Sequence, residues 1–362
     1  MHKRNYIAVV CNYQLKNNRI GSMDRFFIAF NKACIDNGYI IDWFFPKSKK
    51  NELYHKVNLY SDSDSNIETL FLNHINTTKP NYNYVFTHFI ELFTPFYKKV
   101  KDELDCKIIA VDHMSRPIDG FSLKKKVKRK VKYFMYGKYI DKVIAVSQYI
   151  KSQNLKDYSN SLKNKTDVIY NGINLELYGT QNQAKSKVSS KFNFIVVSHL
   201  VYEKGIQDLI LALSKLDKEI FKRITVDVYG EGIYKSVLVD LVNASSLSDI
   251  FSFKGSVDNL YSMYVNYDYM IQPTYMEAFS LSILESLFSN VPVITTTVGG
   301  NVEIIKQGIN GYLFEPKNRE ELKEILINIC DNKLTLEESN IYDEIRRKYT
   351  LDIMVDNYLK LL

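Results

Sequence analysis

Short apolar runs alternate with longer amphipathic segments along most of the chain. In the first half the runs predict buried strands at Tyr6–Cys11, Ile40–Phe45, Tyr84–Thr87, Lys107–Val111, Val143–Val146 and Val168–Tyr170. A helical period recurs between them, for example over Met23–Asn37, where Gly38 ends the predicted helix. Residues 46–66 are rich in Lys, Ser, Asp and Asn, and we expect them to form a surface excursion. Near-continuous apolar strands that alternate with helices indicate a parallel sheet covered on both faces.

The second half repeats this alternation after a polar stretch. Residues 179–190 have no apolar periodicity, and we expect an interdomain linker there. Beyond them, strands are predicted at Phe194–Ser198, Thr225–Tyr229, Phe251–Lys254 and Asp268–Gln272. A chain of 362 residues exceeds one ordinary domain. The sequence therefore predicts an α/β fold with two doubly wound domains, at residues 1–180 and 190–348, followed by an amphipathic helix at about 350–362.

Composition places the chain among globular proteins, since 46% of its residues are hydrophobic and 25% are charged. The sequence begins with a charged stretch and not with an apolar segment, so we expect neither a signal peptide nor a membrane span. The four cysteines show no metal-binding or C-x-x-C spacing, and they read as buried hydrophobes in a reduced compartment: Cys11, Cys34, Cys106 and Cys330.

Positive charge is concentrated in the first half. Residues 1–180 hold 29 Lys and Arg against 17 Asp and Glu, whereas residues 181–362 hold 19 against 24. One segment accounts for much of the excess, with apolar residues at helical spacing among seven basic ones. Those basic residues are Lys124, Lys125, Lys126, Lys128, Arg129, Lys130 and Lys132.

This segment predicts a basic amphipathic helix with Leu123, Val127, Val131 and Phe134 on one side. Such a helix suits an anionic membrane surface. Nucleic acid is a weaker alternative, because no reading motif or aromatic platform accompanies the charge. A simple solvated charged face is the third interpretation.

Two carboxylates frame the start of one predicted helix in the second half. Glu277 follows a short strand, and Glu285 lies in the second turn of a helix that begins at about Leu281. Ser280 and Ser282 are candidate N-caps, and the free amides of the helix start, Leu281 included, suit an anion such as a diphosphate. Glu285 lies about 7 Å along the axis from Ser280. This layout matches a ligand with hydroxyls on either side of an anion, such as a sugar–diphosphate–ribose.

The segment E-A-F-S-L-S-I-L-E resembles the E-x7-E signature of retaining glycosyltransferases, family four in particular. A Pro-Thr lead-in, a Val-Pro-Val strand, a Gly-Gly pair and Asn-Gly-Tyr-Leu-Phe follow in the order of that family. The resemblance implies the GT-B fold, with two Rossmann-like domains facing across a cleft. It assigns acceptor binding to the first domain and nucleotide-sugar binding to the second, with the final helix packed back on the first.

The resemblance also implies roles for residues of the donor site. Glu277 would align the hexose and Glu285 would hold ribose hydroxyls. Lys204, in I-V-V-S-H-L-V-Y-E-K-G, stands where the family has a lysine that binds the diphosphate, and His199 replaces the usual arginine. Gly21 stands in a strand-to-helix turn where the family has Gly-Gly, and it is expected to contact donor phosphate.

Two histidines follow predicted strands of the first half. A family histidine in the position of His113 reaches the transferred sugar, so His113 joins Glu277 and Lys204 as a catalytic candidate. His88 follows the preceding strand and is a second candidate, with a structural role as the alternative.

The sequence thus predicts a retaining, metal-independent glycosyltransferase. Its substrate would be a UDP- or GDP-linked sugar, it would need no cofactor, and its acceptor would be a cell-surface polysaccharide or a lipid-linked glycan. Metal independence is expected because the donor half has no Asp-x-Asp motif. The expected location is cytoplasmic, at the inner face of the plasma membrane. A non-catalytic GT-B partner subunit and a nucleotide-sugar epimerase remain as alternatives.

Overall fold

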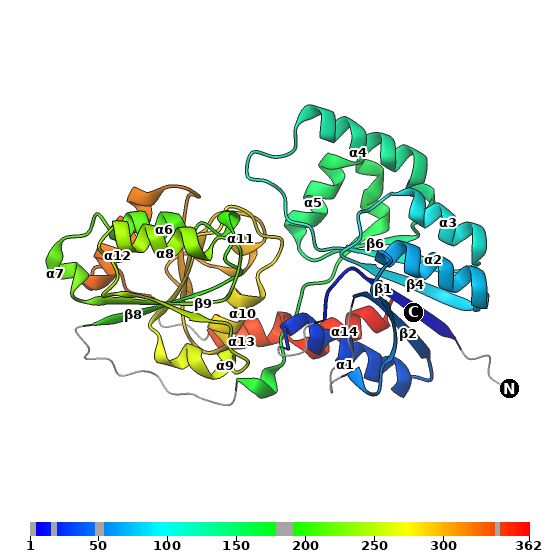
Figure 1. Cartoon of the computed structure of the whole chain (residues 1–362), viewed down its shortest axis with the longest axis horizontal. Coiled ribbons are helices and arrows are strands. Elements are labelled where there is room, and N and C mark those ends of the chain that lie inside the picture. The colour runs from blue at the N-terminus through cyan, green and yellow to red at the C-terminus, as the bar shows by residue number, and fades with distance from the viewer. Residues whose placement is uncertain (1–4, 16–19, 48–53, 179–190, 337–340) are drawn as a thin grey trace. The chain divides into compact units, whose positions relative to one another are not determined.

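The protein, seen in a computed structural model, consists of two compact units (Figure 1). The structure describes residues 5–15, 20–47, 54–178, 191–336 and 341–362. The first unit comprises Met1–Gly172 with Leu351–Leu362, and the second comprises Ile173–Thr350. The interdomain linker predicted at 179–190 lies outside the described residues.

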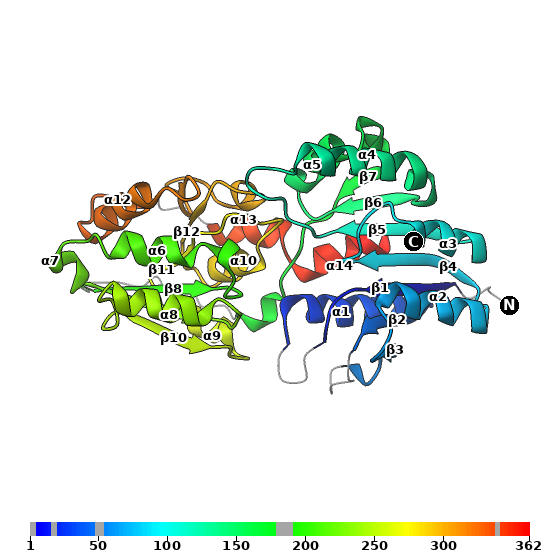
Figure 2. The same cartoon turned by 45° about the horizontal axis from the view of Figure 1, so that its top comes forward.

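The first unit is built on a parallel sheet whose order, in the described residues, is β3-β2-β1-β4-β5-β6-β7 (Figure 2). Its strands are β1 Tyr6–Cys11, β2 Ile40–Pro46, β3 Asn58–Asp62, β4 Tyr82–His88, β5 Lys107–Asp112, β6 Lys142–Ala145 and β7 Thr166–Val168. Its helices are α1 Ser22–Asp36, α2 Ile67–Thr78, α3 Pro95–Glu103, α4 Leu123–Tyr136, α5 Gln148–Asp157 and α14 Leu351–Leu359, with 3-10 turns at Gly137–Tyr139 and Asn160–Lys165. The central strands are buried on both faces, as their apolar runs predict.

The second unit repeats this arrangement with the sheet order β10-β9-β8-β11-β12-β13 in its described part. The strands are β8 Phe192–Val197, β9 Ile224–Tyr229, β10 Phe251–Gly255, β11 Tyr269–Gln272, β12 Val293–Thr296 and β13 Gly311–Phe314. The helices are α6 Ile206–Leu213, α7 Lys218–Phe221, α8 Lys235–Ala244, α9 Leu260–Met263, α10 Leu281–Phe288, α11 Asn301–Ile304, α12 Arg319–Cys330 and α13 Ile341–Lys348. Three 3-10 turns accompany them at Leu175–Leu177, Tyr202–Lys204 and Tyr264–Asn266.

The two sheets share one topology, and the predicted pair of Rossmann-like, doubly wound α/β units is confirmed. In each sheet the strand order reverses at one point, between β1 and β4 in the first unit and between β8 and β11 in the second. Ligands of doubly wound proteins bind beyond the carboxyl ends of the strands at such a reversal. This is where the fold would place a site in either unit.

One part of the prediction is wrong, because residues 46–66 are not only a surface excursion. They contain β3, which pairs in parallel with β2 from Asp42–Asn58 to Pro46–Asp62. The strand was missed because it lies at the edge of the sheet, where its residues are partly or fully exposed and need not be apolar. Tyr60 nevertheless stacks on Phe44 with ring centroids 4.9 Å apart.

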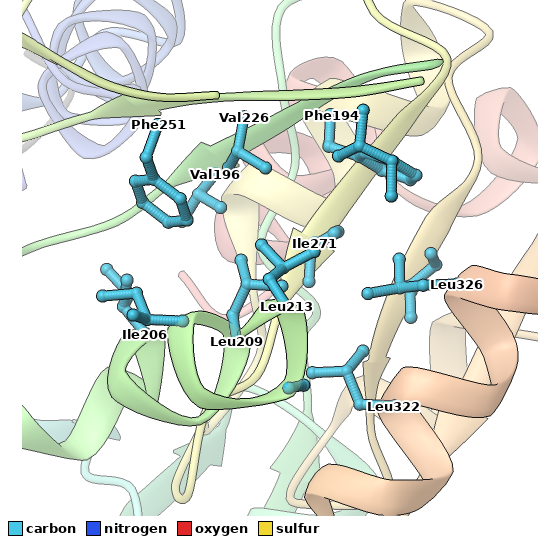
Figure 3. Packing of buried hydrophobic residues seen from close by; sticks show 14 of the residues in the cluster. Phe194, Val196, Ile206, Leu209, Leu213, Val226, Phe251, Ile271, Leu322 and Leu326 are labelled. Atoms are coloured by element: carbon cyan, nitrogen blue, oxygen red, sulfur yellow. The ribbon is translucent and has the colours of Figure 1, made fainter. Parts of the chain in front are cut away.

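The core of the second unit lies between its sheet and the helices that cover one face. Leu209 and Leu213 of α6 point toward the strands, and Leu322 and Leu326 of α12 fill the neighbouring space (Figure 3). All four side chains are buried. At about 25 cal/mol per Å² of apolar surface, this burial is the main term that stabilises the unit.

The last helix, α14, packs against α1 in the first unit. Tyr358 is fully buried there among the rings of Phe26, Phe30 and Phe86. Among the helices of the described ranges, none has the length and apolar character that crossing a membrane requires.

We expect Leu209→Ala to destabilise the second unit by about 2–5 kcal/mol, because it removes a buried side chain and leaves a cavity. The exposed Val237→Ala on α8 serves as control and should change stability by at most about 0.5 kcal/mol. Amide hydrogen exchange in β8 and β9 measures both, since the single tryptophan, Trp43, reports on the other unit. Equal protection in the two variants would contradict the assignment of this core.

Candidate active site

Lys204 and Glu277, two of the predicted catalytic residues, form an ion pair in the second unit. Lys204 ends the 3-10 turn after β8, and Glu277 lies in the loop after β11. Because β8 and β11 are neighbours where the strand order reverses, the two loops meet at one edge of the sheet. Lys204 Nζ lies 2.8 Å from Glu277 Oε2, and the two side chains are 21% and 16% exposed. The fold thus brings both residues together in a half-buried position.

Two glycines permit this close approach of the loops. At Gly205 φ is 68°, and a Cβ atom would lie 1.9 Å from Pro273 O. At Gly299 φ is 62°, and a Cβ atom would lie 1.8 Å from Glu277 O. Both values of φ favour glycine, and both distances exclude any side chain. The backbone from Pro273 to Glu277 is therefore held between two segments that must pass next to it.

Hydrogen bonds fix the same loop from the side of α6. The Tyr275 amide donates to Glu203 O at 2.8 Å, and the Thr274 hydroxyl donates to the same oxygen at 3.2 Å. The Tyr275 hydroxyl donates to Asp208 Oδ2, and Arg319 pairs with Oδ1 of that carboxylate. Glu277 therefore rests on a loop with polar anchors at two preceding residues.

The N-terminus of α10 follows directly after this loop. Of the two predicted candidates, Ser280 is its N-cap and accepts a hydrogen bond from the Ile283 amide, whereas Ser282 lies inside the helix. Gln272 Nε2 donates to the hydroxyls of Ser280 at 2.9 Å and Ser282 at 3.1 Å. The amides of Leu281 and Ser282 precede the amide that Ser280 caps. Amides at a helix start, with the positive end of the helix dipole, suit an anion, and this helix start follows Glu277 closely in the chain.

Glu285 lies in the second turn of α10, and a buried tyrosine holds its carboxylate. The hydroxyl of Tyr264, which is fully buried, donates to Glu285 Oε2 at 3.2 Å. Burial and, to a lesser extent, the Glu285 carboxylate raise the pKa of Tyr264 well above its ordinary value, so Tyr264 remains a donor. Two carboxylates therefore frame the N-terminus of α10, one before it and one inside it.

His199 and Gly21 complete the set predicted for donor binding. His199 is exposed at the start of the loop between β8 and α6. Gly21 precedes α1 in the first unit, and its amide already donates to Asp24 Oδ2 at 2.8 Å. Residues 17–19 of the same turn lie outside the described residues.

Asp24 organises the turn at Gly21. This carboxylate is buried and also accepts hydrogen bonds from the hydroxyls of Tyr13 at 3.0 Å and Tyr54 at 2.8 Å. A Cβ atom at Gly21 would lie 3.1 Å from both Asp24 Oδ2 and Tyr13 Oη. Gly21 therefore leaves room for this network.

His113 and His88 contact each other in the first unit. His88 ends β4, His113 follows β5, and His88 Nδ1 lies 3.0 Å from His113 Nε2. The Phe89 ring stacks on His113 with centroids 4.1 Å apart. Burial lowers the pKa of His113 to about 4, although Asp112 opposes the shift, and it lowers the pKa of His88 well below its ordinary value. Both rings are neutral at pH 7.

A buried ionic cluster shapes the loop that carries His113. Asp112 Oδ1 accepts the Met114 amide at 2.9 Å, and Asp112 Oδ2 lies 3.0 Å from Arg116 Nη2. Arg116 also binds Asp157 at 2.8 Å and Asn154 at 2.7 Å on α5. The main chain beside His113 is thereby fixed to α5.

Arg129 of α4 belongs to the same cluster, and its predicted membrane contact is wrong. Arg129 Nη2 lies 3.4 Å from Asp157 Oδ2, its guanidinium lies 4.2 Å from the Tyr158 ring centroid, and the residue is 3% exposed. Because Arg129 is buried against this carboxylate, it is not exposed to a membrane surface, and breaking the pair would leave an unpaired buried charge. The other predicted basic residues differ, since Lys132 pairs with Glu91 at 2.7 Å and Lys124, Lys125, Lys126, Lys128 and Lys130 are exposed.

The apolar stripe of α4 faces away from the unit. Leu123 and Phe134 are 81% and 89% exposed, and Val127 and Val131 are also exposed. The helix instead packs inward through Arg129 and the half-buried ring of Tyr133. At 100° per residue, the exposed lysines lie on both sides of this stripe.

Several supporting residues were not found from the sequence. Asp112 and Arg116 stand close to His113 after a strand, so their charges could have indicated an ordered loop. Tyr264 gave no signal, because its contact with Glu285 spans 21 residues. Phe89 gave none either, because its φ of 58° cannot be inferred for a phenylalanine. Within the described ranges, no group of three or more His, Cys, Asp or Glu residues is arranged to hold a metal ion.

Residues 179–348 match the family model described as glycosyl transferases group 1. An uncharacterized glycosyltransferase of Methanocaldococcus jannaschii is 32% identical over 65% of this chain and 61% of its own length. A probable sucrose-phosphate synthase of Thermosipho melanesiensis is 28% identical over 59% of this chain and 51% of its own. The chain thus spans between half and two thirds of the length of these relatives.

Solved structures resemble the chain over nearly its whole length. The Anabaena protein HepE in complex with UDP aligns with a TM-score of 0.74 at 17% identity, covering 99% of both chains. Sucrose-phosphate synthase from Thermosynechococcus elongatus aligns with a TM-score of 0.77 at 16% identity, covering 99% of this chain and 98% of that one. These comparisons confirm the predicted GT-B fold class and support a glycosyltransferase of group 1.

Proposed function

We propose that the protein is a retaining glycosyltransferase that takes a sugar from a UDP- or GDP-linked donor. The observation that carries this proposal is the Lys204–Glu277 pair beside the N-terminus of α10. The pair lies within the segment that matches the group 1 family model. A nucleotide sugar offers the matching ligand, because it has hydroxyls on both sides of a diphosphate.

Each candidate site residue of the second unit would then bind a different part of the donor. Lys204 has three donors and uses one for Glu277, so it can also neutralise the diphosphate. The amides of Leu281 and Ser282 bind phosphate oxygens at the helix start. Glu277 aligns hexose hydroxyls, and Glu285, fixed by Tyr264, accepts hydrogen bonds from the ribose.

Retention follows from the chemistry that this arrangement favours. An inverting enzyme needs a general base opposite the leaving group, and a double displacement needs a carboxylate that attacks the anomeric carbon. Glu277 already pairs with Lys204, and in the proposed role, in which it aligns the hexose hydroxyls, it serves as neither. We therefore propose departure and attack on one face, where the diphosphate takes the acceptor proton. Lys204 and the α10 amides stabilise its developing charge without a divalent metal.

The acceptor that we propose is a cell-surface polysaccharide or a lipid-linked glycan at the inner face of the plasma membrane. Support comes from α4, where an exposed stripe of Leu123, Val127, Val131 and Phe134 is flanked by exposed lysines. Apolar side chains can enter the acyl boundary while lysines pair with anionic headgroups. A protein placed there meets a membrane-borne acceptor in two dimensions.

Replacing Glu285 and replacing Glu277 should affect different kinetic parameters. Glu285→Ala should raise the KM or Kd for the nucleotide sugar, and Glu277→Ala should mainly lower kcat, because each loses a charged hydrogen bond worth about 1.5–3 kcal/mol. Steady-state kinetics and donor titration measure the split. Glu219→Ala, on the exposed face of α7, is the matched control. Activity of both site variants within about twofold of the wild type would refute the assignment.

Transfer should retain the anomeric configuration and continue in excess chelator. Proton NMR of the new glycosidic linkage reads the configuration, and the same reaction with and without a chelator tests for a metal. An inverted product, or activity that returns only with added metal, would contradict the mechanism. Epimerised donor without any transfer product would favour a nucleotide-sugar epimerase.

The protein should bind vesicles that contain anionic lipid and bind neutral vesicles much more weakly. Replacing Lys124, Lys126, Lys128 and Lys130 by Gln should lower binding by orders of magnitude, since each contributes about 1 kcal/mol near such a surface. Vesicle sedimentation at low and high salt measures the effect. The control replaces Lys218, Lys222, Lys333 and Lys348, which are exposed elsewhere. An equal loss in the control would show that only net charge matters.

A further inference from the structure

The surroundings of His88 and His113 determine which of the two rings donates the hydrogen bond between them. His88 Nδ1 and His113 Nε2 are 3.0 Å apart, and both rings are neutral at pH 7. A neutral imidazole carries one proton, so one ring donates across the contact and the other accepts. Which ring donates also determines whether the second nitrogen of each ring is protonated or bare.

The second nitrogen of His88, Nε2, lies in an apolar enclosure. His88 is fully buried, and its ring packs against the rings of Phe26, Phe27 and Tyr358. Among the described residues, Nε2 has no hydrogen-bond partner. A proton on Nε2 would be a buried donor without an acceptor, and orphaned buried N–H groups are rarer than under-satisfied acceptors.

This asymmetry places the proton of His88 on Nδ1. The Nδ1–H then donates to His113 Nε2, which must be a bare acceptor. The single proton of neutral His113 is consequently on Nδ1. His113 is only partly buried, so this nitrogen belongs to a ring that a ligand can approach.

We propose that His88 is a positioning residue that holds His113 in the Nδ1–H tautomer, so that His113 offers the transferred sugar a hydrogen-bond donor and no base. The proposal rests on the proposed function for its sugar ligand. The stacked Phe89 ring and the Asp112–Arg116 contact fix the orientation of the ring and of its backbone, and His88 fixes its proton.

The tautomer has a chemical consequence for the reaction. A bare Nδ1 could remove a proton from a sugar or acceptor hydroxyl, as a general base does. A protonated, neutral Nδ1 can only donate, which suits the oxygen of a sugar hydroxyl. His113 therefore orients the sugar while the diphosphate takes the acceptor proton, in agreement with transfer on one face.

Nitrogen-15 NMR of histidine-labelled protein at pH 7 tests the proposal without any substrate. Two-bond proton–nitrogen correlations distinguish the two tautomers, and the signals of His113 and His88 are assigned from His113→Ala and His88→Asn. We expect an Nδ1–H tautomer for both residues in the wild type. An Nε2–H tautomer of His113 overturns the proposal, whatever the enzyme transfers.

Two variants of equal size, His88→Asn and His88→Asp, test the effect of the tautomer on catalysis. His88→Asn keeps an N–H donor close to the position of Nδ1, whereas the carboxylate of His88→Asp can only accept and should draw the His113 proton to Nε2. We expect kcat to stay near the wild-type value for His88→Asn. It should fall about tenfold or more for His88→Asp, as for a lost hydrogen bond of the transition state, with KM for the donor changed less.

The outcomes separate this inference from the function on which it rests. Equal kcat for the two variants, with the His113 tautomer changed in His88→Asp, overturns the positioning role. If His88→Asp does not fold, the wild-type spectrum still decides the tautomer. A wild type with the expected tautomer that transfers no sugar overturns the proposed function and supports the proton assignment.

Discussion

The second unit depends on two backbone contacts that exclude side chains. Gly205 passes against Pro273 O, and Gly299 passes against Glu277 O, each at a distance that leaves no room for a Cβ atom. Both glycines also have left-handed backbone. Only under these conditions can a loop after β8 and a loop after β12 close on the loop after β11 from both sides. The ion pair of Lys204 and Glu277 depends on this packing, because the two residues lie on separate loops that meet where the strand order reverses.

The first unit depends on a different interaction, because it holds paired charged side chains in its buried interior. Arg116 and Arg129 share Asp157, and Asp112 closes the cluster toward His113. Paired in this way, the charges tie α4, α5 and the loop after β5 into one body. An unpaired partner in that interior would cost several kcal/mol, so the cluster tolerates little change. It also explains why α4 can leave its apolar stripe exposed, because Arg129 and the Tyr133 ring, and not the residues of the stripe, hold the helix to the unit.

Much of the fold and of the candidate site could be predicted from the sequence, and the wrong predictions share a physical cause. Most strands of both sheets are apolar runs, because a parallel sheet is buried on both faces. The segment from Glu277 to Glu285 and the separate I-V-V-S-H-L-V-Y-E-K-G stretch suggested Glu277, Glu285 and Lys204 as site residues, and the fold pairs Lys204 with Glu277. The edge strand β3 was missed because its exposed positions may be polar, which removes the periodic signal. Arg129 was misplaced because seven basic residues look alike in one dimension, and only Asp157 on another helix distinguishes the buried one.

The position of α14 has a consequence for how the molecule folds. This helix is separated from the rest of the first unit by the 178 residues of Ile173–Thr350, yet Tyr358 packs under His88 and among the phenylalanines of α1. On the ribosome the second unit is therefore synthesised before the first can bury these rings. Until then an aromatic surface on α1 and β4 stays open to solvent or to a chaperone, and the wall behind the histidine pair is among the last parts of the interior to close.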